Sequence, residues 1–460
     1  MAFKCFKPGR NAQSMDMTSG PIAMQILMFS LPLLAGNVFQ QFYNTVDSVV
    51  VGNFVGPEAL GAVTANMPAT MTLISLFIGF SSGASVVISQ YFGAKNEEKL
   101  RKTVHTSVVA TVFLSFAMTA LGILITPALV YFMKTPPEIA DMAMIYLRIY
   151  FAGLIWQMLY NMGSAILRAV GDSRRPLYFL IFCSLCNVAL DLLFVIRFRM
   201  GVAGVAWATV LSQFFSAIMV FYVLFRSREV YSCRMREMRI DPDMLKRIIQ
   251  IGLPAGAQMA LTSFSNVFVM SYVNGFGAGS TSGWGAYQRI DAFTVLPVTS
   301  IGLAITTFTG QNAGAGNIDR IKQGARVALG MGLGITAALS ALMFILAPQA
   351  IGLFNKDPEV LHYGVLFLRV QGPLDFLICF NQCYAGILRG IGDAKTPMII
   401  MLGSFVLFRQ IYLFVASHLT ASIYPIALAY PAGWALCSLI LFLYYRHSNW
   451  EERLVQGVLQ

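Results

Sequence analysis

The residues best suited to chemistry in this sequence are carboxylates that stand inside long apolar segments. Asp47 lies in YNTVDSVVVG (43–52), and no Lys or Arg occurs between Arg10 and Lys95. A charged Asp at the middle of a membrane costs roughly 2.5–3.5 kcal/mol, so such residues usually face an interior and mark ion or proton pathways. Asp47 is therefore either a polar residue tolerated near a helix end or a residue on which function depends.

A second carboxylate, Asp191, follows Asn187 by four residues in NVALDLL, so the two side chains share one face of a helix. Thr209 adds a hydroxyl group in the next apolar segment. Two close carboxylates titrate as a coupled pair, so one could carry a proton near neutral pH. With amide and hydroxyl oxygens nearby, they could instead surround a small hard cation. The alternative is neutralisation of an Asp by Arg148, the only intramembrane Arg in this half.

Polar and aromatic residues continue from these acids along two helix faces. Gln40, Tyr43 and Asp47 are spaced at i, i+3 and i+7, and a similar stripe contains Tyr146 and Asn161. Aromatic and acidic groups that line a cavity suit an organic cation. Taken singly, each Tyr could equally serve packing or anchor a helix at the membrane interface.

The composition places these residues in a polytopic membrane protein. The 460 residues are 57% hydrophobic and only 12% charged, and the mean hydropathy is +0.67. Soluble domains carry about 25% charged residues. The net charge of +11 sits in short loops, which indicates membrane topology and no nucleic-acid partner.

Motifs for other chemistry are missing from the sequence. The seven Cys have no nearby His or second pair at zinc spacing, and they are expected to be small buried helix residues. No Gly-Lys dipeptide occurs, so the sequence has no phosphate-binding loop. No His, Cys or acid set has catalytic spacing. We therefore expect no enzymatic activity, no cofactor and no metal beyond a coupling ion.

Twelve apolar segments are each long enough to cross about 30 Å of hydrocarbon as a helix. They predict an all-α protein with twelve transmembrane helices. The N-terminus has basic residues but no short apolar core before a cleavage site, so we expect no removable signal peptide. The segments are 23–51, 59–92, 103–126, 139–169, 177–196, 201–225, 244–275, 284–312, 325–346, 359–388, 397–417 and 424–445.

The basic residues between these segments predict the orientation. The N-terminus and alternate loops hold most of the Lys and Arg, whereas the opposite loops hold only Lys134, Arg197, Arg199 and Lys356. Cytoplasmic loops carry an excess of Lys and Arg. We therefore expect a multi-pass protein of the cell inner (plasma) membrane with both termini cytoplasmic, although the pair Arg197 and Arg199 goes against this trend.

The sequence also repeats itself at a spacing of 221 residues. ILRAVGDSRRP at 166–176 returns as ILRGIGDAKTP at 387–397, and QYFGAKN at 90–96 returns as QNAGAGN at 311–317. Internal repeats are typical of transporters, and six helices per repeat give both halves one orientation. The predicted parts are a cytoplasmic segment 1–22, an N-lobe 23–225, a basic linker 226–243, a C-lobe 244–446 and a cytoplasmic tail 447–460.

Residues that occur in both halves most simply serve folding, helix capping and packing, which both halves require. Arg168 and Arg389 should end helices, where a cation meets the helix dipole, and Asp172 and Asp393 should lie in tight Gly turns before the next helix. A gating role at the cytoplasmic face is the alternative. Pro32 and its repeat partner Pro254 lie inside predicted spans, where proline bends a helix.

Polar residues that occur in only one half are better candidates for a function that only that half performs. The acid set of the first half has no counterpart in the second at the aligned positions. Asp47 aligns with Val269, Asn187 with Phe408, Asp191 with Tyr412, Thr209 with Tyr430 and Asn161 with Gln382.

The duplicated plan, the segment LPLLAGNVFQQFYNTVDSVVVG, the two Leu-Arg-x-x-Gly-Asp turns and QYFGAKN together resemble the multidrug and toxic compound extrusion (MATE) family over residues 20 to 450. The resemblance implies two six-helix lobes in a V around a central cavity. It also implies export of cationic amphipathic compounds in exchange for H⁺ or Na⁺.

The resemblance also implies site residues. In one prokaryotic branch the cation site lies in the N-lobe, and the matching residues here are Asp47, Asn187, Asp191 and Thr209, with Gln40, Tyr43, Tyr146 and Asn161 around them. A second branch has an acid on helix 7, but the segment GLPAGAQMALTSFSN contains none. For the other acids of the second half, we expect Asp291 to pair with Arg289, and Asp375 receives no role.

The resulting hypothesis is a monomeric ion-coupled antiporter for small cationic compounds in a lipid bilayer. Asp47 and Asp191 would bind H⁺ or Na⁺, and occupancy would bend or release the first helix near Pro32. The rival is a flippase for lipid-linked saccharides on a related fold. Such a protein would favour a cavity lined with several cations, for which Arg148, Arg289, Arg369 and Arg409 are the candidates.

Overall fold

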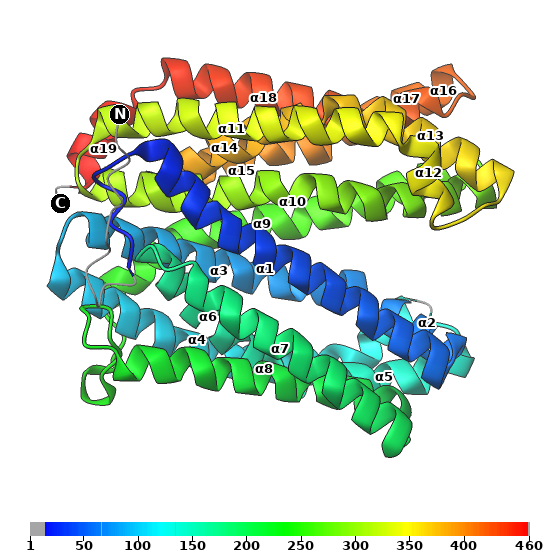
Figure 1. The fold of residues 1–460 in the computed structure, drawn as a ribbon, viewed down its shortest axis with the longest axis horizontal. Helices are drawn as coiled ribbons and strands as arrows, with labels where there is room; N and C mark the ends of the chain where they lie inside the picture. The colour runs from blue at the N-terminus through cyan, green and yellow to red at the C-terminus, as the bar shows by residue number, and fades with distance from the viewer. Residues whose placement is uncertain (1–13, 66, 134, 459–460) are drawn as a thin grey trace, which may run out of the picture.

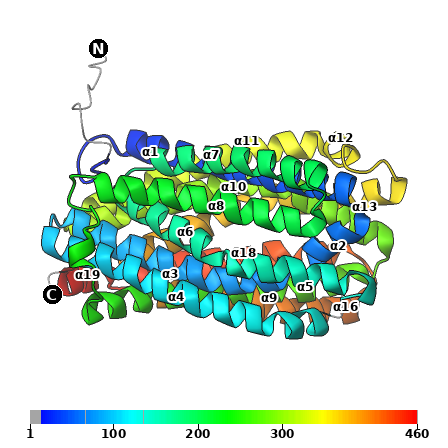
Figure 2. The same ribbon diagram turned by 90° about the horizontal axis from the view of Figure 1, so that it is seen from below.

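The computed structural model describes residues 14–65, 67–133 and 135–458. Helices run back and forth along one long axis and form two layers, and the two ends of the described chain lie at the same end of the molecule (Figure 1). Figure 2 shows the same parallel packing from the side. We call the end where the described chain begins and finishes the termini end, and the opposite end the far end.

The first layer is the N-lobe, whose helices follow the predicted spans closely. Two described helices lie within the predicted second span, one on each side of position 66, and the predicted fourth span bends by 45° at Gly153. The helices are α1 (Ile22–Val50), α2 (Pro57–Ala65), α3 (Met67–Gly93), α4 (Glu97–Phe132), α5 (Pro137–Ala152), α6 (Leu154–Ala169), α7 (Arg174–Leu192) and α8 (Gly201–Arg226).

The second layer is the C-lobe, and it repeats this plan. The break between α13 and α14, bent by 49°, corresponds to the break between α5 and α6. The helices are α9 (Pro242–Asn274), α10 (Ala278–Gly314), α11 (Ile318–Ile345), α12 (Ala347–Gly352), α13 (Pro358–Gln371), α14 (Phe376–Gly390), α15 (Lys395–Leu402), α16 (Arg409–Leu419), α17 (Tyr424–Ala427) and α18 (Ala429–His447). A last helix, α19 (Trp450–Val458), follows in the predicted tail.

The described helices account for a twelve-span architecture. Single helices or continuous runs of them form nine segments that are long and apolar enough to cross a membrane, and the two bent pairs bring the number to eleven. The 33-residue α9 does not reach this hydropathy, but it runs the length of the C-lobe as the remaining crossing. Its lower apolarity agrees with its place between the lobes, where it packs on α3.

Helix α1 belongs to both lobes. Its first half is buried with residues of the C-lobe, where Phe29 and Leu33 share a core with Ile301. Its second half lies along α7 of the N-lobe. Figure 1 shows α1 running obliquely between the layers. The chain therefore places Pro32 against one lobe and Asp47, at the far end of α1, against the other.

The repeated Leu-Arg-x-x-Gly-Asp turns have the predicted structure. Gly171 has a φ of 88° and Gly392 of 99°, values that glycine adopts without strain. Asp172 Oδ1 then accepts the backbone N–H groups of Arg174 and Arg175, both at 3.1 Å, and so caps α7. Arg168 lies in the last turn of α6, as expected for a cation at a helix C-terminus.

Candidate ion-binding site

Two carboxylates separated by more than 140 residues in the sequence meet in the N-lobe. Asp47 near the end of α1 and Asp191 near the end of α7 lie close enough for their carboxyl groups to contact each other. Each helix continues as a π-helical turn just after its acid, at Val51–Val55 and Leu193–Arg197. Such turns shift the hydrogen-bond ladder and occur often at functional sites.

Burial makes this pair costly to leave unneutralised. Asp191 and Asn187 are fully buried. Apart from the contact between the two carboxyl groups, no hydrogen-bond donor within the described residues reaches Asp47 Oδ1 or either oxygen of Asp191. The Asn187 side-chain oxygen and nitrogen are likewise without partners there. A buried carboxylate without donors is strongly destabilised unless it binds a proton or a cation.

Three further predicted residues border the pair. Tyr146 lies near both acids, and Tyr43 lies near Asp47 with its hydroxyl group against Thr209. The Thr209 hydroxyl donates to Val205 O at 3.2 Å, which leaves its oxygen lone pairs free to accept. Carboxylate, amide and hydroxyl oxygens suit a small hard cation, and a shared proton would suit the paired acids equally.

The other predicted site residues lie apart from this pair. Gln40 is exposed, and Asn161 on α6 lines a space of about 10 Å³ beside Ile74, Met118 and Gln157. No hydrogen bond in the described part of the chain joins either side chain to the acids. The alternative of neutralisation by Arg148 also receives no support, because Arg148 is exposed and forms no ion pair with a described residue.

The C-lobe contains a second acid pair, which corrects one expectation. We expected Asp291 to pair with Arg289, but within the described residues no ion pair joins them, and Arg289 lies over the ring of Phe354 at 5.8 Å. Two residues apart on a helix, the side chains point in different directions. Asp291 instead lies near Asp375 and against Tyr287.

Gln371 completes this C-lobe cluster and was not singled out from the sequence. The Tyr287 hydroxyl donates to Gln371 Oε1 at 2.9 Å, while Gln371 Nε2 is buried without a partner among the described residues. The sequence signal was available, since Gln371 stands four residues before Asp375. The break in the helix between them hid the relation.

A buried cation, Arg409 on α16, lies elsewhere in the C-lobe. Its guanidinium donates to Ser265 Oγ at 3.0 Å and to Asn266 Oδ1 at 2.7 Å, and it stacks 4.5 Å from the Tyr430 ring centroid. These partners are neutral and belong to α9 and α18. Arg409 therefore ties three C-lobe helices together at the place where the N-lobe holds its acids in the repeat.

Known proteins resemble this chain over nearly its whole length. The MatE family model matches it twice, at residues 32–193 and 254–415. The probable multidrug resistance protein YoeA of Bacillus subtilis is 30% identical over 442 residues, which cover 94% of this chain and 95% of that protein. The probable multidrug resistance protein NorM of Thermotoga maritima is 26% identical over 446 residues, 94% of each chain.

Solved structures share the fold. A MATE transporter in complex with MaL6 has a TM-score of 0.91 at 24% sequence identity, over 97% of this chain and 100% of that one. The two family matches coincide with the two lobes, as the internal repeat requires. Because the family model covers more than half of the chain and YoeA matches it nearly end to end, the protein belongs to the MatE family of membrane transporters, together with these multidrug resistance proteins.

Proposed function

We propose that the protein is a multidrug efflux antiporter that exports cationic amphipathic compounds in exchange for H⁺ or Na⁺. The observation that carries the proposal is the contact between the carboxyl groups of Asp191, which is fully buried, and of Asp47, which is half-buried. Within the described residues no basic side chain forms an ion pair with either acid, so a proton or cation is the natural occupant. Asn187 and Thr209 provide the remaining oxygens.

Coupling would pass through α1. Asp47 sits on the half of α1 that lies along α7, whereas the half containing Pro32 packs on the C-lobe, where Asn37 Nδ2 donates to Ser300 Oγ at 3.2 Å. An ion bound between α1 and α7 holds the far half of α1 to the N-lobe. Pro32 leaves a carbonyl of the preceding turn unbonded, which makes a bend at this point less costly.

The substrate would oppose the ion through the same helix. A ligand shifts a conformational equilibrium only through different affinities for the two states. A cationic compound near Asp47, Tyr43 and Tyr146 gains from the bare carboxylates and the aromatic rings. Protonation or Na⁺ binding removes that attraction, so ion and substrate would compete.

The basic loops support an orientation for this cycle. The termini end carries Arg101, Arg175, Arg247, Arg320 and most of the other basic residues, which by the positive-inside rule would face the cytoplasm. The proposed location is the inner membrane, with the far end of the molecule outside. Each chain holds both lobes, so the proposed transporting unit is the monomer.

The flippase alternative is not favoured. It would need several cations gathered at one place, but Arg148 is exposed, Arg289 lies over Phe354 and Arg369 lies over Phe344 at 5.5 Å. Arg409 is held by Ser265 and Asn266. Three of the four guanidinium groups thus lie against aromatic rings or neutral side chains, and these contacts give no support to a pyrophosphate site.

The test is transport of a fluorescent cationic dye by vesicles under an imposed H⁺ or Na⁺ gradient. Asp47→Asn keeps the size of the side chain but removes its charge and its titration, so we expect gradient-driven export to fall to background. Asp141→Asn, an exposed acid on α5, is the matched control and should transport normally. Wild-type export by Asp47→Asn would refute the central role of the pair.

A further inference from the structure

The repeated motif Gln-x-x-Gly has no part in the ion site, yet both copies lie at one place in the fold. Gln90 and Gly93 end α3 of the N-lobe, and Gln311 and Gly314 end α10 of the C-lobe. Both helices finish at the termini end, where the two lobes touch.

The two glutamines make reciprocal hydrogen bonds between the lobes. Gln90 Nε2 donates to the backbone oxygen of Gly390, the last residue of α14, at 2.9 Å. Gln311 Nε2 donates to the backbone oxygen of Ala169, the last residue of α6, at 3.0 Å. Each lobe thus uses its own glutamine to satisfy an unpaired carbonyl at the end of a helix in the other lobe.

The two glycines make a reciprocal close approach. A Cβ atom on Gly93 would lie 1.8 Å from the backbone oxygen of Gln311, and one on Gly314 would lie 1.8 Å from the backbone oxygen of Gln90. The same closeness continues inward, where a Cβ on Gly79 would lie 2.3 Å from Gly256 Cα. Because the opposing atoms are backbone, no change of rotamer could relieve such a clash.

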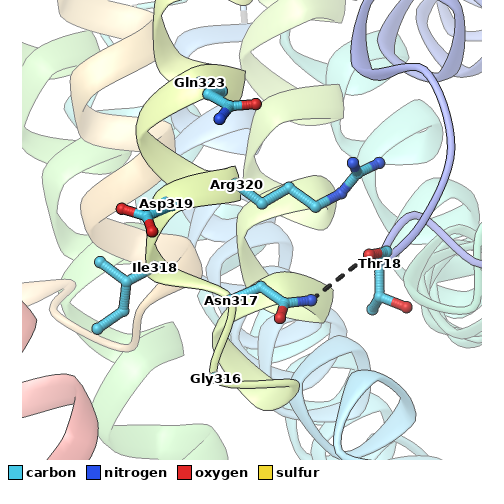
Figure 3. A pocket seen from close by; sticks show the side chains of 7 residues that line it. All are labelled: Thr18, Gly316, Asn317, Ile318, Asp319, Arg320 and Gln323. Carbon is cyan, nitrogen blue, oxygen red and sulfur yellow. Dashed lines mark hydrogen bonds between the residues drawn. The ribbon is translucent and has the colours of Figure 1, made fainter.

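The N-terminal segment 15–18, which we call the strap, covers one side of this contact. Met17 is fully buried; its N–H group donates to Gln311 Oε1 at 2.8 Å, and its carbonyl accepts from Asn312 Nδ2 at 3.1 Å and Arg320 Nε at 3.0 Å. Figure 3 shows Asn317 and Arg320 reaching from the start of α11 toward Thr18, whose carbonyl accepts from Asn317.

The strap also touches the N-lobe. A Cβ atom on Gly171 would lie 2.2 Å from Met15 O, so the strap runs against the turn that follows α6. The other glutamine has a different partner, since Gln90 Oε1 accepts from Arg247 Nη2 at 3.0 Å. The pseudo-symmetric contact is therefore completed by the strap on one side and by α9 on the other.

We propose that the paired Gln-x-x-Gly motifs, together with the strap, form the gate that closes the termini end between the lobes. Opening this end requires the lobes to separate, which breaks both glutamine bonds and parts both glycine contacts. The proposal goes beyond the proposed antiport in assigning the closing residues. It concerns the distance between the lobes, which can be measured without ion or substrate.

The test is a distance measurement between the lobes at the termini end. Spin labels are placed at the exposed positions Glu97 and Asp319, one in each lobe, in a full-length protein with its seven cysteines replaced. Pulsed electron spin resonance on reconstituted protein should give one main short distance for the parent. Gly93→Ala and Gly314→Ala should each add a longer distance and lose most of the short one.

Two sets of variants complete the design. Gly285→Ala changes a glycine of α10 that has no atom within 4 Å of the added Cβ, so it should keep the parent distance. Gln90→Leu and Gln311→Leu remove the hydrogen bonds without adding a clash, and each should shift part of the population to the longer distance. They keep the test valid even if a glycine variant fails to fold.

The outcomes separate clearly. Parent-like distances in both folded glycine variants would overturn the gate. Parent-like distances in both glutamine variants would overturn the part played by the hydrogen bonds and the strap. Because these measurements need no transport, a failure of the Asp47 and Asp191 proposal would leave their result unchanged.

Discussion

At the scale of single residues, the question is which buried acids bind the coupling ion. Asp47 and Asp191 form one pair and Asp291 and Asp375 another, and in each pair the second acid is buried while the first is half-buried. The N-lobe pair has beside it Asn187, whose side-chain oxygen has no partner among the described residues, and Thr209, whose hydroxyl donates to Val205 O. The C-lobe pair has beside it the Tyr287 hydroxyl, which donates to Gln371 Oε1, and the Gln371 amide nitrogen, which has no partner among the described residues and can donate.

This difference predicts unequal effects of removing each pair. Asp191→Asn should abolish gradient-driven export, because it removes half of the only pair that we assign to the coupling ion. Asp375→Asn should retain export, since an amide can replace a protonated acid in a hydrogen-bonded cluster. Dye export under separate H⁺ and Na⁺ gradients provides the comparison. Loss of export only in Asp375→Asn would move the coupling site to the C-lobe.

Asn187 provides a second test at this scale. Its amide is fully buried without a partner among the described residues, which costs about 1–3 kcal/mol unless something binds there. Asn187→Leu should therefore keep or raise the melting temperature of the ion-free protein while weakening its stabilisation by the ion. Thermal unfolding across a series of Na⁺ concentrations and pH values measures both. A variant with unchanged ion stabilisation would exclude Asn187 from the site.

At the scale of elements, α1 is the helix that belongs to both lobes. Pro32 lies in the half of α1 that packs on the C-lobe, and Asp47 lies in the half that packs on the N-lobe. A bend at Pro32 would therefore link an ion bound at Asp47 to the position of the C-lobe. The π-helical turns after Asp47 and Asp191 place the two helix ends side by side, where they pack in one small core.

Pro32→Ala tests this connection. The substitution restores a hydrogen bond within α1 and stiffens it, so we expect slower export with ion binding largely unchanged. Pro127→Ala in α4 is the matched control, because Pro127 is an exposed proline inside a helix of the N-lobe. Initial rates of dye export should fall for the first variant only. Equal rates for both would remove Pro32 from the mechanism.

The repeated turns have a structural role that is testable at the same scale. Asp172 caps α7 and lies 3.3 Å from Arg175 Nε, and it is almost fully buried. Loss of such a cap costs about 0.5–2 kcal/mol. Asp172→Ala should lower the melting temperature of detergent-solubilised protein, while export per folded molecule stays near the parent value. A variant with normal stability and lost export would instead assign this turn to gating.

At the scale of the whole molecule, the lobes meet closely at the termini end. Gly79, Gly83, Gly93 and Gly314 let the backbones of α3, α9 and α10 approach within contact distance. Bistable interfaces of this kind turn a small change at an ion site into a movement of whole lobes. The second half of α1 lies on the N-lobe and carries Asp47. Binding of an ion at Asp47 can therefore change the packing of the first half of α1 on the C-lobe.

Much of this arrangement could be predicted from sequence. The twelve apolar segments agree with the helices to within a few residues at most ends, because length and hydropathy are local properties. The acid set of Asp47, Asn187 and Asp191 emerged because comparison of the halves separates shared structural residues from unshared polar ones. The predicted pairing of Asp291 with Arg289 was wrong, because closeness in sequence does not place two side chains on one face of a helix.

The sequence by itself determined that this is a duplicated membrane protein with acids inside apolar segments of its first half, since composition, periodicity and repeats require no knowledge of contacts, and its resemblance to the MATE family implied transport. The tertiary structure alone decided which acids meet, that helices bend at Gly153 and at Asp375, and that Gln90 and Gln311 reach across to opposite lobes. These facts depend on distances between residues far apart in the chain. Such distances are set by packing of the whole molecule rather than by any local pattern.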